Sequence, residues 1–340
     1  MGRLGWTTLL AMIPATLHAG GDNHDPSYIA HISLFVVKVH AHSAQGKTAL
    51  GSGVMVGPGE VATNCHVTRN ADSIVVRKGG IWLTVQSQRA NLGRDLCLLT
   101  VPVTPAIPTA PLRSASDVAP GQPVYAVGFP GGAGSMFANG RIHSLHGFDG
   151  ARVIETTTGF NLGASGGALF DESGRLLGLT TFRARGSRDY HFYAIPSDWL
   201  DDVRRQSPQA VAPLDAALQP FWSEARTRQP YFLQAVPLES EEDWEGLRRV
   251  AAQWSRDDPN DADAWYFLAR AQSRLDRPDE AVPALQRAIR LNPEFGRAWF
   301  ELGLLYARLG RTDDVELVRV SLMSLDEELE QELSGALGGI

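Results

Sequence analysis

Short apolar stretches separated by turn residues fill the chain from about residue 29 to residue 195. Two of them, 54–56 and 61–63, are joined by Gly57-Pro58-Gly59, which is typical of a hairpin. About a dozen short strands at this close spacing predict an all-β barrel or sandwich. The stretches are 32–39, 54–56, 61–63, 74–76, 81–85, 96–99, 124–127, 152–156, 167–170, 176–180 and 192–195.

Beyond residue 200 the apolar positions no longer fit short strands. Ser197-Asp198-Trp199-Leu200 is typical of the capped start of a helix. Prolines then interrupt residues 201–240, which predicts a connector with short helices only. These prolines are Pro208, Pro213, Pro220, Pro230 and Pro237. From residue 241 to about 335 the spacing is helical, so the chain divides into an all-β part and an all-α part.

The helical part repeats itself after 34 residues. Three matches carry the repeat: Ala264-Trp265 with Ala298-Trp299, Leu268 with Leu302, and Pro259 with Pro293. This pattern resembles the tetratricopeptide (TPR) repeat, whose helix pairs bury their apolar faces by stacking. The second unit departs from it at Val315 and Arg319, and a degenerate helix, Trp244 to Trp254, is expected in front. We expect Trp265, Trp299 and Tyr306 to pack between helices.

Composition and charge narrow the location and the partners of the protein. The chain has 340 residues, 44% of them apolar, and a formal charge of −7, with no basic excess that would favour nucleic acid. Residues 1–19 resemble a bacterial secretory signal, because Arg3 precedes the mostly apolar stretch 4–17 and Ala19 offers a cleavage site. No other apolar run reaches the roughly 18 residues of a membrane span. We expect a periplasmic or secreted protein without a membrane span once the signal is removed.

The cysteines and histidines suggest no metal or cofactor. Cys65 and Cys97 are too few for a disulfide framework, and we favour two buried thiols over a single bridge. No cluster of histidine, cysteine and aspartate has the spacing of a metal site. His40 and His42 share one face of a predicted strand, and a half-exposed strand explains them better than a metal pair.

Three short motifs carry the candidate chemistry. Peptide hydrolysis without a metal requires a nucleophile, a base and donors for the developing oxyanion. Ser165 lies in Gly163-Ala164-Ser165-Gly166-Gly167, where glycines let backbone amides approach that oxyanion. Upstream, His66 lies in Thr63-Asn64-Cys65-His66-Val67, and Asp95 opens the apolar run Leu96-Cys97-Leu98-Leu99.

In this order, the motifs resemble the trypsin-like serine protease family, closest to its HtrA/Deg branch. The resemblance covers about residues 28–200 and implies a chymotrypsin-type double β-barrel. It implies His66 as general base and acid, Asp95 as the partner that fixes the imidazole tautomer, and Ser165 as nucleophile. The backbone amides of Gly163 and Ser165 would form the oxyanion hole. The expected organisation is a signal peptide (1–19), a protease domain (28–200), a connector (201–240) and TPR-like repeats (241–335).

Two details around Ser165 qualify this resemblance. The motif also fits G-x-S-x-G, the nucleophile elbow of α/β-hydrolases, but that fold requires a helix after the serine where Leu169-Phe170 and a turn follow here. Ala164 stands where many relatives carry Asp or Asn. Activation by a new N-terminus that pairs with such a side chain is therefore not expected.

The resemblance also suggests where a substrate side chain would bind. The predicted pocket residues are Gly159, Thr180, Thr181, Phe182 and His191. Gly159 near the floor leaves no acid to pair with lysine or arginine. His191 could favour an acidic or polar side chain, and a filled pocket that prefers small residues is an equal alternative.

The sequence favours a serine endopeptidase that acts on protein or peptide substrates through an acyl-enzyme, without a cofactor. Its TPR tail would recruit a protein partner or a substrate. A catalytically silent scaffold that acts through the repeats is the alternative, but a binding module would not need the complete set of motif residues. An esterase that uses the same residues is a third hypothesis.

Overall fold

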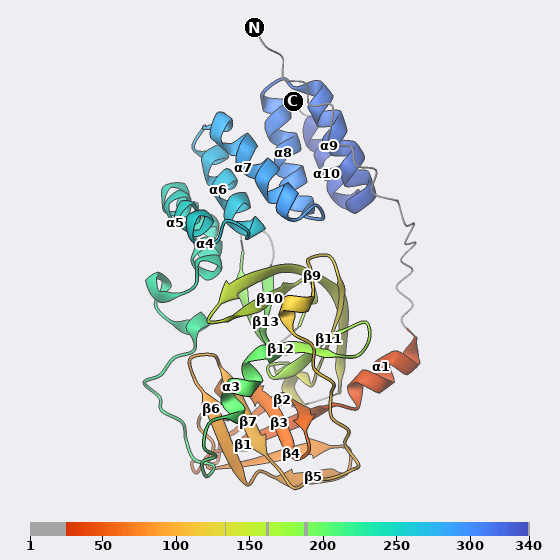
Figure 1. The fold of residues 1–340 in the computed structure, drawn as a ribbon, viewed down its shortest axis with the longest axis vertical. Coiled ribbons are helices and arrows are strands. Elements are labelled where there is room, and N and C mark those ends of the chain that lie inside the picture. The colour runs from red at the N-terminus through yellow and green to blue at the C-terminus, as the bar shows by residue number, and fades with distance from the viewer. Residues whose placement is uncertain (1–24, 133, 161–162, 187–189, 339–340) are drawn as a thin grey trace.

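A computed structural model describes residues 25–132, 134–160, 163–186 and 190–338. The predicted signal segment, residues 1–19, lies outside this range. In Figure 1 a helical part lies above a sheet-rich part, and helix α1 (Pro26–Ser33) lies at the side of the sheets. The predicted division into an all-β part followed by an all-α part is confirmed.

The first sheet has seven strands in the order β5-β4-β1-β2-β3-β7-β6, with antiparallel neighbours. They are β1 (Val36–His42), β2 (Thr48–Gly57), β3 (Glu60–Asn64), β4 (Ser73–Lys78), β5 (Ile81–Thr84), β6 (Ser87–Asn91) and β7 (Leu96–Thr100). Strands β2 and β3 form the predicted hairpin around Pro58-Gly59. Buried Val39, Val61, Ile74 and Leu99 belong to one hydrophobic cluster of this unit, a half-barrel.

The second unit is a closed barrel of six strands in the order β10-β13-β12-β11-β8-β9. The strands are β8 (Pro123–Gly128), β9 (Met136–Phe148), β10 (Ala151–Thr156), β11 (Gly167–Asp171), β12 (Leu176–Arg185) and β13 (Tyr190–Pro196). Leu169, Ile154 and Ala194 lie in a buried cluster within it. Together with the half-barrel, this unit confirms the predicted trypsin-like fold.

One predicted strand begins later than expected. The run 32–39 predicted a strand from Ile32, but Ile32 and Ser33 end helix α1, and β1 starts at Val36. The Asp25 side chain accepts the backbone N–H of Ser27 at 2.9 Å, and Pro26 occupies the first helical position. An N-terminal cap followed by proline favours helix at this point and outweighs the β-propensity of isoleucine.

The helical part consists of helices that pack on one another in sequence order (Figure 1). They are α4 (Tyr231–Ser240), α5 (Trp244–Asp257), α6 (Ala262–Arg274), α7 (Pro278–Leu291), α8 (Gly296–Arg308), α9 (Thr312–Leu325) and α10 (Glu327–Leu337). The Trp265 indole N–H donates to the Pro259 carbonyl at 3.0 Å, and that of Trp299 donates to the Pro293 carbonyl at 2.9 Å. The same bond thus recurs after 34 residues, as the predicted repeat requires. Tyr306 is buried, and both tryptophans are partly buried.

The connector runs beside the first sheet before it reaches the helices (Figure 1). After the 3-10 turn η3 (Ser197–Trp199) and helix α3 (Leu200–Arg204), Gln209 exchanges two backbone hydrogen bonds with Gln88 of β6, both at 2.8 Å. Two further 3-10 turns, η4 (Phe221–Ser223) and η5 (Arg226–Arg228), precede α4. The connector therefore contains short helices, and its last ten residues form α4, which packs on α5.

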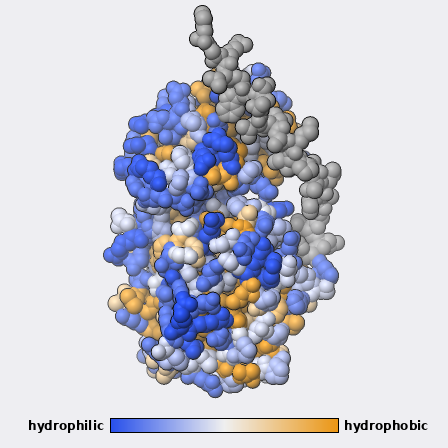
Figure 2. Space-filling view, in the orientation of Figure 1, coloured by the Kyte–Doolittle hydropathy of each residue, from blue (hydrophilic) through white to orange (hydrophobic). Residues whose placement is uncertain are grey.

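The exposed faces are mixed in polarity. Figure 2 shows hydrophilic residues spread over both parts of the molecule, with hydrophobic residues between them. Leu317, Val320 and Met323 are exposed apolar residues on α9. Every helix within the described residues is too short or too polar to cross a membrane.

Candidate active site

The predicted base and its carboxylate partner lie next to each other. His66 belongs to the short helix α2 (Cys65–Thr68) directly after β3, and Asp95 directly precedes β7, the neighbour of β3. The His66 Nδ1 atom lies 2.6 Å from Asp95 Oδ2, and the His66 backbone N–H donates to Asp95 Oδ1 at 2.8 Å. The Asp95 side chain is 1% exposed and that of His66 is 29% exposed. The carboxylate is thus shielded, whereas the imidazole remains accessible to a substrate.

A disulfide joins Cys65 and Cys97, so the expectation of two free thiols is wrong. The pairing of β3 with β7 sets Thr63 opposite Cys97, and the Cα atoms of the two cysteines are 4.9 Å apart. This separation lies within the normal range for a bridge, but the strand register that produces it cannot be read from the cysteine count. The bridge connects the residue before His66 to the second residue after Asp95. It therefore ties together the two segments that carry the pair.

The backbone of Asp95 adopts an uncommon left-handed conformation, with φ of 59°. Such a conformation costs on the order of 1 kcal/mol for a residue other than glycine, and aspartate tolerates it better than most. The Asp95 carbonyl accepts the Cys65 backbone N–H and the Asn64 side-chain amide, both at 3.1 Å. The same Asn64 amide donates to Thr181 Oγ1 at 3.0 Å. Asn64 therefore links the Asp95 turn to strand β12 of the second barrel.

Ser165 lies in the loop before β11, and its hydroxyl is bonded to strand β12. Its hydroxyl donates to the Thr181 carbonyl at 3.3 Å, and among the described residues it has no hydrogen bond to His66. The glycines around it are sterically required. A Cβ on Gly163, where φ is 93°, would lie 2.3 Å from the Gly131 nitrogen, and one on Gly166, where φ is 79°, would lie 2.2 Å from the Ser52 carbonyl oxygen.

The backbone amides expected to bind an oxyanion are free of internal partners. Neither the Gly163 N–H nor the Ser165 N–H donates a hydrogen bond to another residue in the described ranges. The next two amides are used, because the Gly166 N–H donates to the Thr180 carbonyl at 2.9 Å and the Gly167 N–H to the Ala164 carbonyl at 2.8 Å. These two amides therefore remain available as donors beside the serine, as an oxyanion hole would need.

Ser52 of β2 supports this loop from the first sheet, a role the sequence analysis missed. Its backbone N–H donates to the Ser165 carbonyl at 2.9 Å, and its hydroxyl donates to the Gly163 carbonyl at 3.2 Å. The hydroxyl also accepts the Phe129 backbone N–H at 2.8 Å. Ser52 is fully buried. A serine between two glycines in an apolar strand was the available signal.

The residues predicted to line a substrate pocket point in different directions. Gly159 lies near Phe192, since an ideal Cβ on Gly159 would be 4.0 Å from Phe192 Cζ. The Phe192 ring lies 5.1 Å from the ring of Phe160. His191 precedes Phe192 on β13, so it faces the opposite side of the strand, where its Nδ1 lies 2.7 Å from Glu155 Oε1. The structure therefore does not bring His191 together with Gly159.

The other three predicted pocket residues form part of the barrel wall. The Thr180 hydroxyl donates to the Ala164 carbonyl at 2.8 Å, and the Thr181 hydroxyl donates to the Leu179 carbonyl at 2.7 Å. Phe182 stacks on Tyr193 with ring centroids 4.8 Å apart. Thr180 supports the serine loop through the Ala164 carbonyl, and Thr181 does so through its own carbonyl, which accepts the Ser165 hydroxyl.

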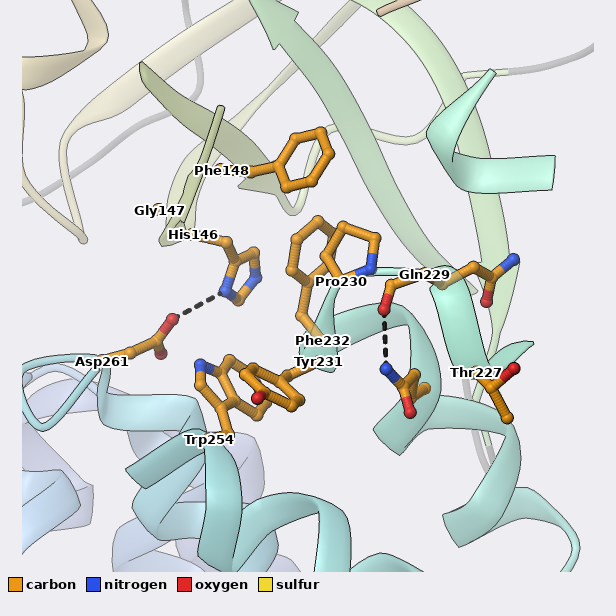
Figure 3. A pocket seen from close by; sticks show the side chains of 11 residues that line it. His146, Gly147, Phe148, Thr227, Gln229, Pro230, Tyr231, Phe232, Trp254 and Asp261 are labelled. Atoms are coloured by element: carbon orange, nitrogen blue, oxygen red, sulfur yellow. Dashed lines mark hydrogen bonds and ion pairs between the residues drawn. The ribbon is translucent and has the colours of Figure 1, made fainter. Parts of the chain in front are cut away.

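A second group of histidines and carboxylates lies between the barrel and the helices. His146 of β9 is 2% exposed; its Nε2 lies 2.9 Å from Glu155 Oε2, and its Nδ1 lies 3.1 Å from Asp261 Oδ2, at the start of α6. Figure 3 shows the bond from His146 to Asp261 and, beside the imidazole, the Phe232 ring, which stacks on it at 4.3 Å. These residues border an open crevice of about 370 Å³. Below, this group is called the interdomain cluster: His143, His146, His191, Glu155, Asp261 and Asp263.

Charge within the interdomain cluster shifts several pKa values. Burial opposes a charge on His146, but Asp261 and Glu155 outweigh it and raise the pKa of His146 well above its usual value. In the same way, burial opposes charge on His143, and Glu155 and Asp263 overcome it and raise the pKa of His143 to about 9. Burial would raise the pKa of Glu155, yet the neighbouring histidines hold it well below its usual range.

The interdomain cluster also contains three residues with the arrangement of metal ligands. Ligand atoms of His146, Asp261 and Asp263 lie within 4.8 Å of one another, the one such group among the described residues. Both ring nitrogens of His146 already have carboxylate partners, so ion pairing accounts for the group. The sequence analysis missed it because His146 and Asp261 are 115 positions apart and no spacing signals their contact.

With this geometry in place, comparisons with known proteins show what two parts of the chain are similar to. Residues 51–179 match the family model of the trypsin-like peptidase domain, and residues 268–314 match that of the tetratricopeptide repeat. The chain therefore contains a trypsin-like peptidase domain followed by TPR repeats.

Individual relatives that match this part of the chain include proteins named serine endoproteases. A probable periplasmic serine endoprotease DegP-like from Halomonas elongata is 32% identical over 48% of this chain and 36% of its own length. The serine endoprotease DegS of Salmonella typhimurium is 31% identical over 44% of each chain. The chain thus spans less than half the length of these curated relatives. A solved structure, HtrA-type protease AlgW with tripeptide, is 28% identical and covers 53% of this chain and 63% of its own, with a TM-score of 0.47.

Proposed function

We propose that this chain is a serine endopeptidase that cleaves proteins or peptides through an acyl-enzyme on Ser165. The observation that carries the proposal is the His66–Asp95 pair at 2.6 Å, connected to Ser165 through Asn64 and Thr181. The family match of residues 51–179 and the names of the relatives support the same reaction.

In this mechanism, each group has one role. Asp95 accepts the Nδ1–H of His66, so Nε2 is left as the base that removes the hydroxyl proton of Ser165. The Ser165 oxygen attacks the scissile carbonyl, and the amides of Gly163 and Ser165 stabilise the oxyanion. His66 then donates the proton to the leaving amine. In the second half, His66 takes a proton from a water molecule that attacks the acyl carbonyl, and it returns this proton to the Ser165 oxygen as the acyl group leaves. To begin, the Ser165 hydroxyl must leave the Thr181 carbonyl and rotate toward His66.

For the substrate, we propose a preference for small side chains before the cut. Phe160 is buried and its ring lies 5.1 Å from that of Phe192, so aromatic groups occupy the space beside Gly159. His191 is engaged by Glu155 on the other face of β13, which argues against an acidic preference. Profiling on a peptide library is expected to enrich alanine, serine or valine before the cut. Enrichment of acidic or large residues there would overturn this preference.

We further propose a periplasmic or extracellular location with the TPR repeats as a recruitment surface. A disulfide persists in oxidising compartments, and the DegP-like relative is named periplasmic. Residues 268–314 match a repeat family whose stacked helices form extended binding surfaces.

Cleavage of an unfolded protein such as reduced casein tests the activity. The wild type is expected to produce fragments, and Ser165→Ala and His66→Ala are expected to produce none above background. Ser173→Ala, in the turn after β11, is the matched control and should cleave like the wild type. Equal cleavage by Ser165→Ala would refute the mechanism, and absence of cleavage by the wild type under all conditions would favour the scaffold alternative.

A further inference from the structure

A residue of the connector reaches the candidate active site. The Trp222 indole N–H donates to Asp95 Oδ2 at 3.1 Å, across 127 positions of sequence. This is the same oxygen that faces His66 Nδ1. With the His66 backbone N–H on Oδ1, the buried Asp95 carboxylate has three donors, and one of them comes from outside the peptidase domain match.

The indole is also packed against the imidazole and the barrel. The Trp222 ring lies edge-on to the His66 ring, with centroids 5.6 Å apart and planes at 85°. The same ring stacks on Phe182 at 5.4 Å, with planes at 17°. Because an aromatic edge and a stacked face both restrict rotation, the N–H is held toward Asp95.

The turn that presents Trp222 is anchored at both ends. The preceding residue, Phe221, is buried against Phe148 at 4.8 Å, and its backbone N–H donates to the carbonyl of Gly93, two residues before Asp95, at 2.8 Å. On the other side, the Gln229 side-chain amide donates to the Trp222 carbonyl at 2.9 Å. The turn is therefore attached directly to the segment that carries the carboxylate.

Thr181 of β12, which Asn64 links to the Asp95 carbonyl, does not use its hydroxyl on the Asp95 carboxylate. The Thr181 hydroxyl donates to Leu179 and accepts from Asn64, so its hydrogen bonds go elsewhere. Tryptophan has a donor and no acceptor, so this N–H favours the ionised form of the carboxylate. A bond to a charged acceptor contributes more than a neutral one.

We propose that Trp222 is a positioning residue for the candidate triad: it fixes and stabilises the Asp95 carboxylate that orients His66. It acts through Asp95 and does not contact the reacting atoms. The proposal rests on the proposed function, and it makes the connector, and not only residues 28–200, part of the catalytic apparatus.

The test compares Trp222→Phe with the matched control Trp82→Phe, whose ring is exposed on β5 and stacks on Arg77. Trp222→Phe keeps an aromatic ring for Phe182 and removes only the donor. We expect its kcat on a peptide substrate to fall about 10- to 150-fold, the range of one hydrogen bond to a charged group, with KM within about twofold of wild type. The acid limb of kcat/KM should move to higher pH by about half a unit, because a carboxylate with one donor fewer attracts the imidazolium proton more strongly.

A second measurement separates this proposal from the proposed function. In the Ser165→Ala background, which needs no turnover, NMR titration of His66 should show a midpoint at higher pH when Trp222→Phe is added, and no change when Trp82→Phe is added. An unchanged titration midpoint of His66 overturns the proposal. A rise in KM overturns it as well, if kcat and the acid limb of kcat/KM do not change. If Trp222→Phe fails to fold, Gln229→Ala should give the same shift at smaller size, and an unmoved midpoint in that variant overturns it equally. Absence of proteolysis in the wild type would refute the proposed function alone.

Discussion

The molecule contains two histidine–carboxylate groups with opposite surroundings. His66 is 29% exposed and bonds its carboxylate through Nδ1. His146 is 2% exposed and has carboxylate partners on both nitrogens. The same pair of chemical groups thus leaves one nitrogen available in the first case and none in the second.

This difference assigns the two groups to different tasks. A general base requires a free nitrogen and access to substrate, which His66 provides. A buried imidazole with two carboxylates is instead an ion-pair cluster, whose loss on one side leaves uncompensated charge. The interdomain cluster therefore connects the helical part to the barrel, whereas under the proposed function the His66–Asp95 pair performs the chemistry.

The largest expected effect separates these tasks by activity. Asp95→Asn should lower kcat/KM by about 10⁴-fold, because the amide favours the wrong imidazole tautomer. Asp263→Asn, in the interdomain cluster, is the matched change and should alter kcat/KM by less than about threefold in protein that remains folded. Steady-state kinetics on one peptide would check both. Comparable losses in the two variants would contradict the division.

The next effect separates them by stability. His146→Gln should lower the free energy of unfolding by about 3–5 kcal/mol, because Asp261 would remain buried without a cationic partner and Glu155 would keep only His143 and His191. His42→Gln, at the partly exposed end of β1, should cost less than about 0.5 kcal/mol. Urea unfolding followed by tryptophan fluorescence gives both values. Equal costs would show that the cluster does not hold the interface.

Removing the disulfide tests how the His66–Asp95 pair is held in place. Cys65→Ala combined with Cys97→Ala should lower the free energy of unfolding by about 3–4 kcal/mol, the loop-closure value for a separation of 32 residues. It should also reduce kcat, since the bridge fixes the segments that carry His66 and Asp95. Ala41→Ser with Ala49→Ser on β1 and β2 provides a double substitution away from the site. An unchanged kcat would show that the strands position the pair without the bridge.

Proton binding provides the smallest and most specific test. The pKa of His143 is about 9 in the folded protein and about 6.5 in the unfolded chain. Its contribution to the free energy of unfolding is therefore complete below pH 6.5 and is lost as the pH rises toward 9. The pKa of Glu155 is lowered in the folded protein. Its contribution to stability is therefore complete at any pH above the pKa of an unfolded glutamate, and it is lost only as the pH falls further. Unfolding at pH 6 and pH 9 should therefore show lower stability at pH 9, with a smaller difference in His143→Gln. The same difference in both proteins would exclude His143 as its source.

The two groups also differ in how far the sequence predicted them. His66, Asp95 and Ser165 stand in local motifs whose glycines and strand starts have physical reasons, so their places could be assigned in advance. The Cys65–Cys97 bridge depended on the register of β3 with β7, which a cysteine count does not contain. The interdomain cluster and Trp222 depended on docking of segments more than 100 positions apart, for which no local pattern exists. Ile32 was assigned to a strand because the cap at Asp25 and Pro26 was not weighed against its β-propensity.

Covalent labelling tests most directly whether the His66–Asp95 pair activates Ser165. A fluorophosphonate probe added to the full chain, followed by peptide mapping, should place a single adduct on Ser165. The adduct should be absent in Ser165→Ala and strongly slowed in His66→Ala, while His146→Gln should still be labelled when folded. No adduct on the wild type at any pH, or an adduct that persists in Ser165→Ala, would contradict the account.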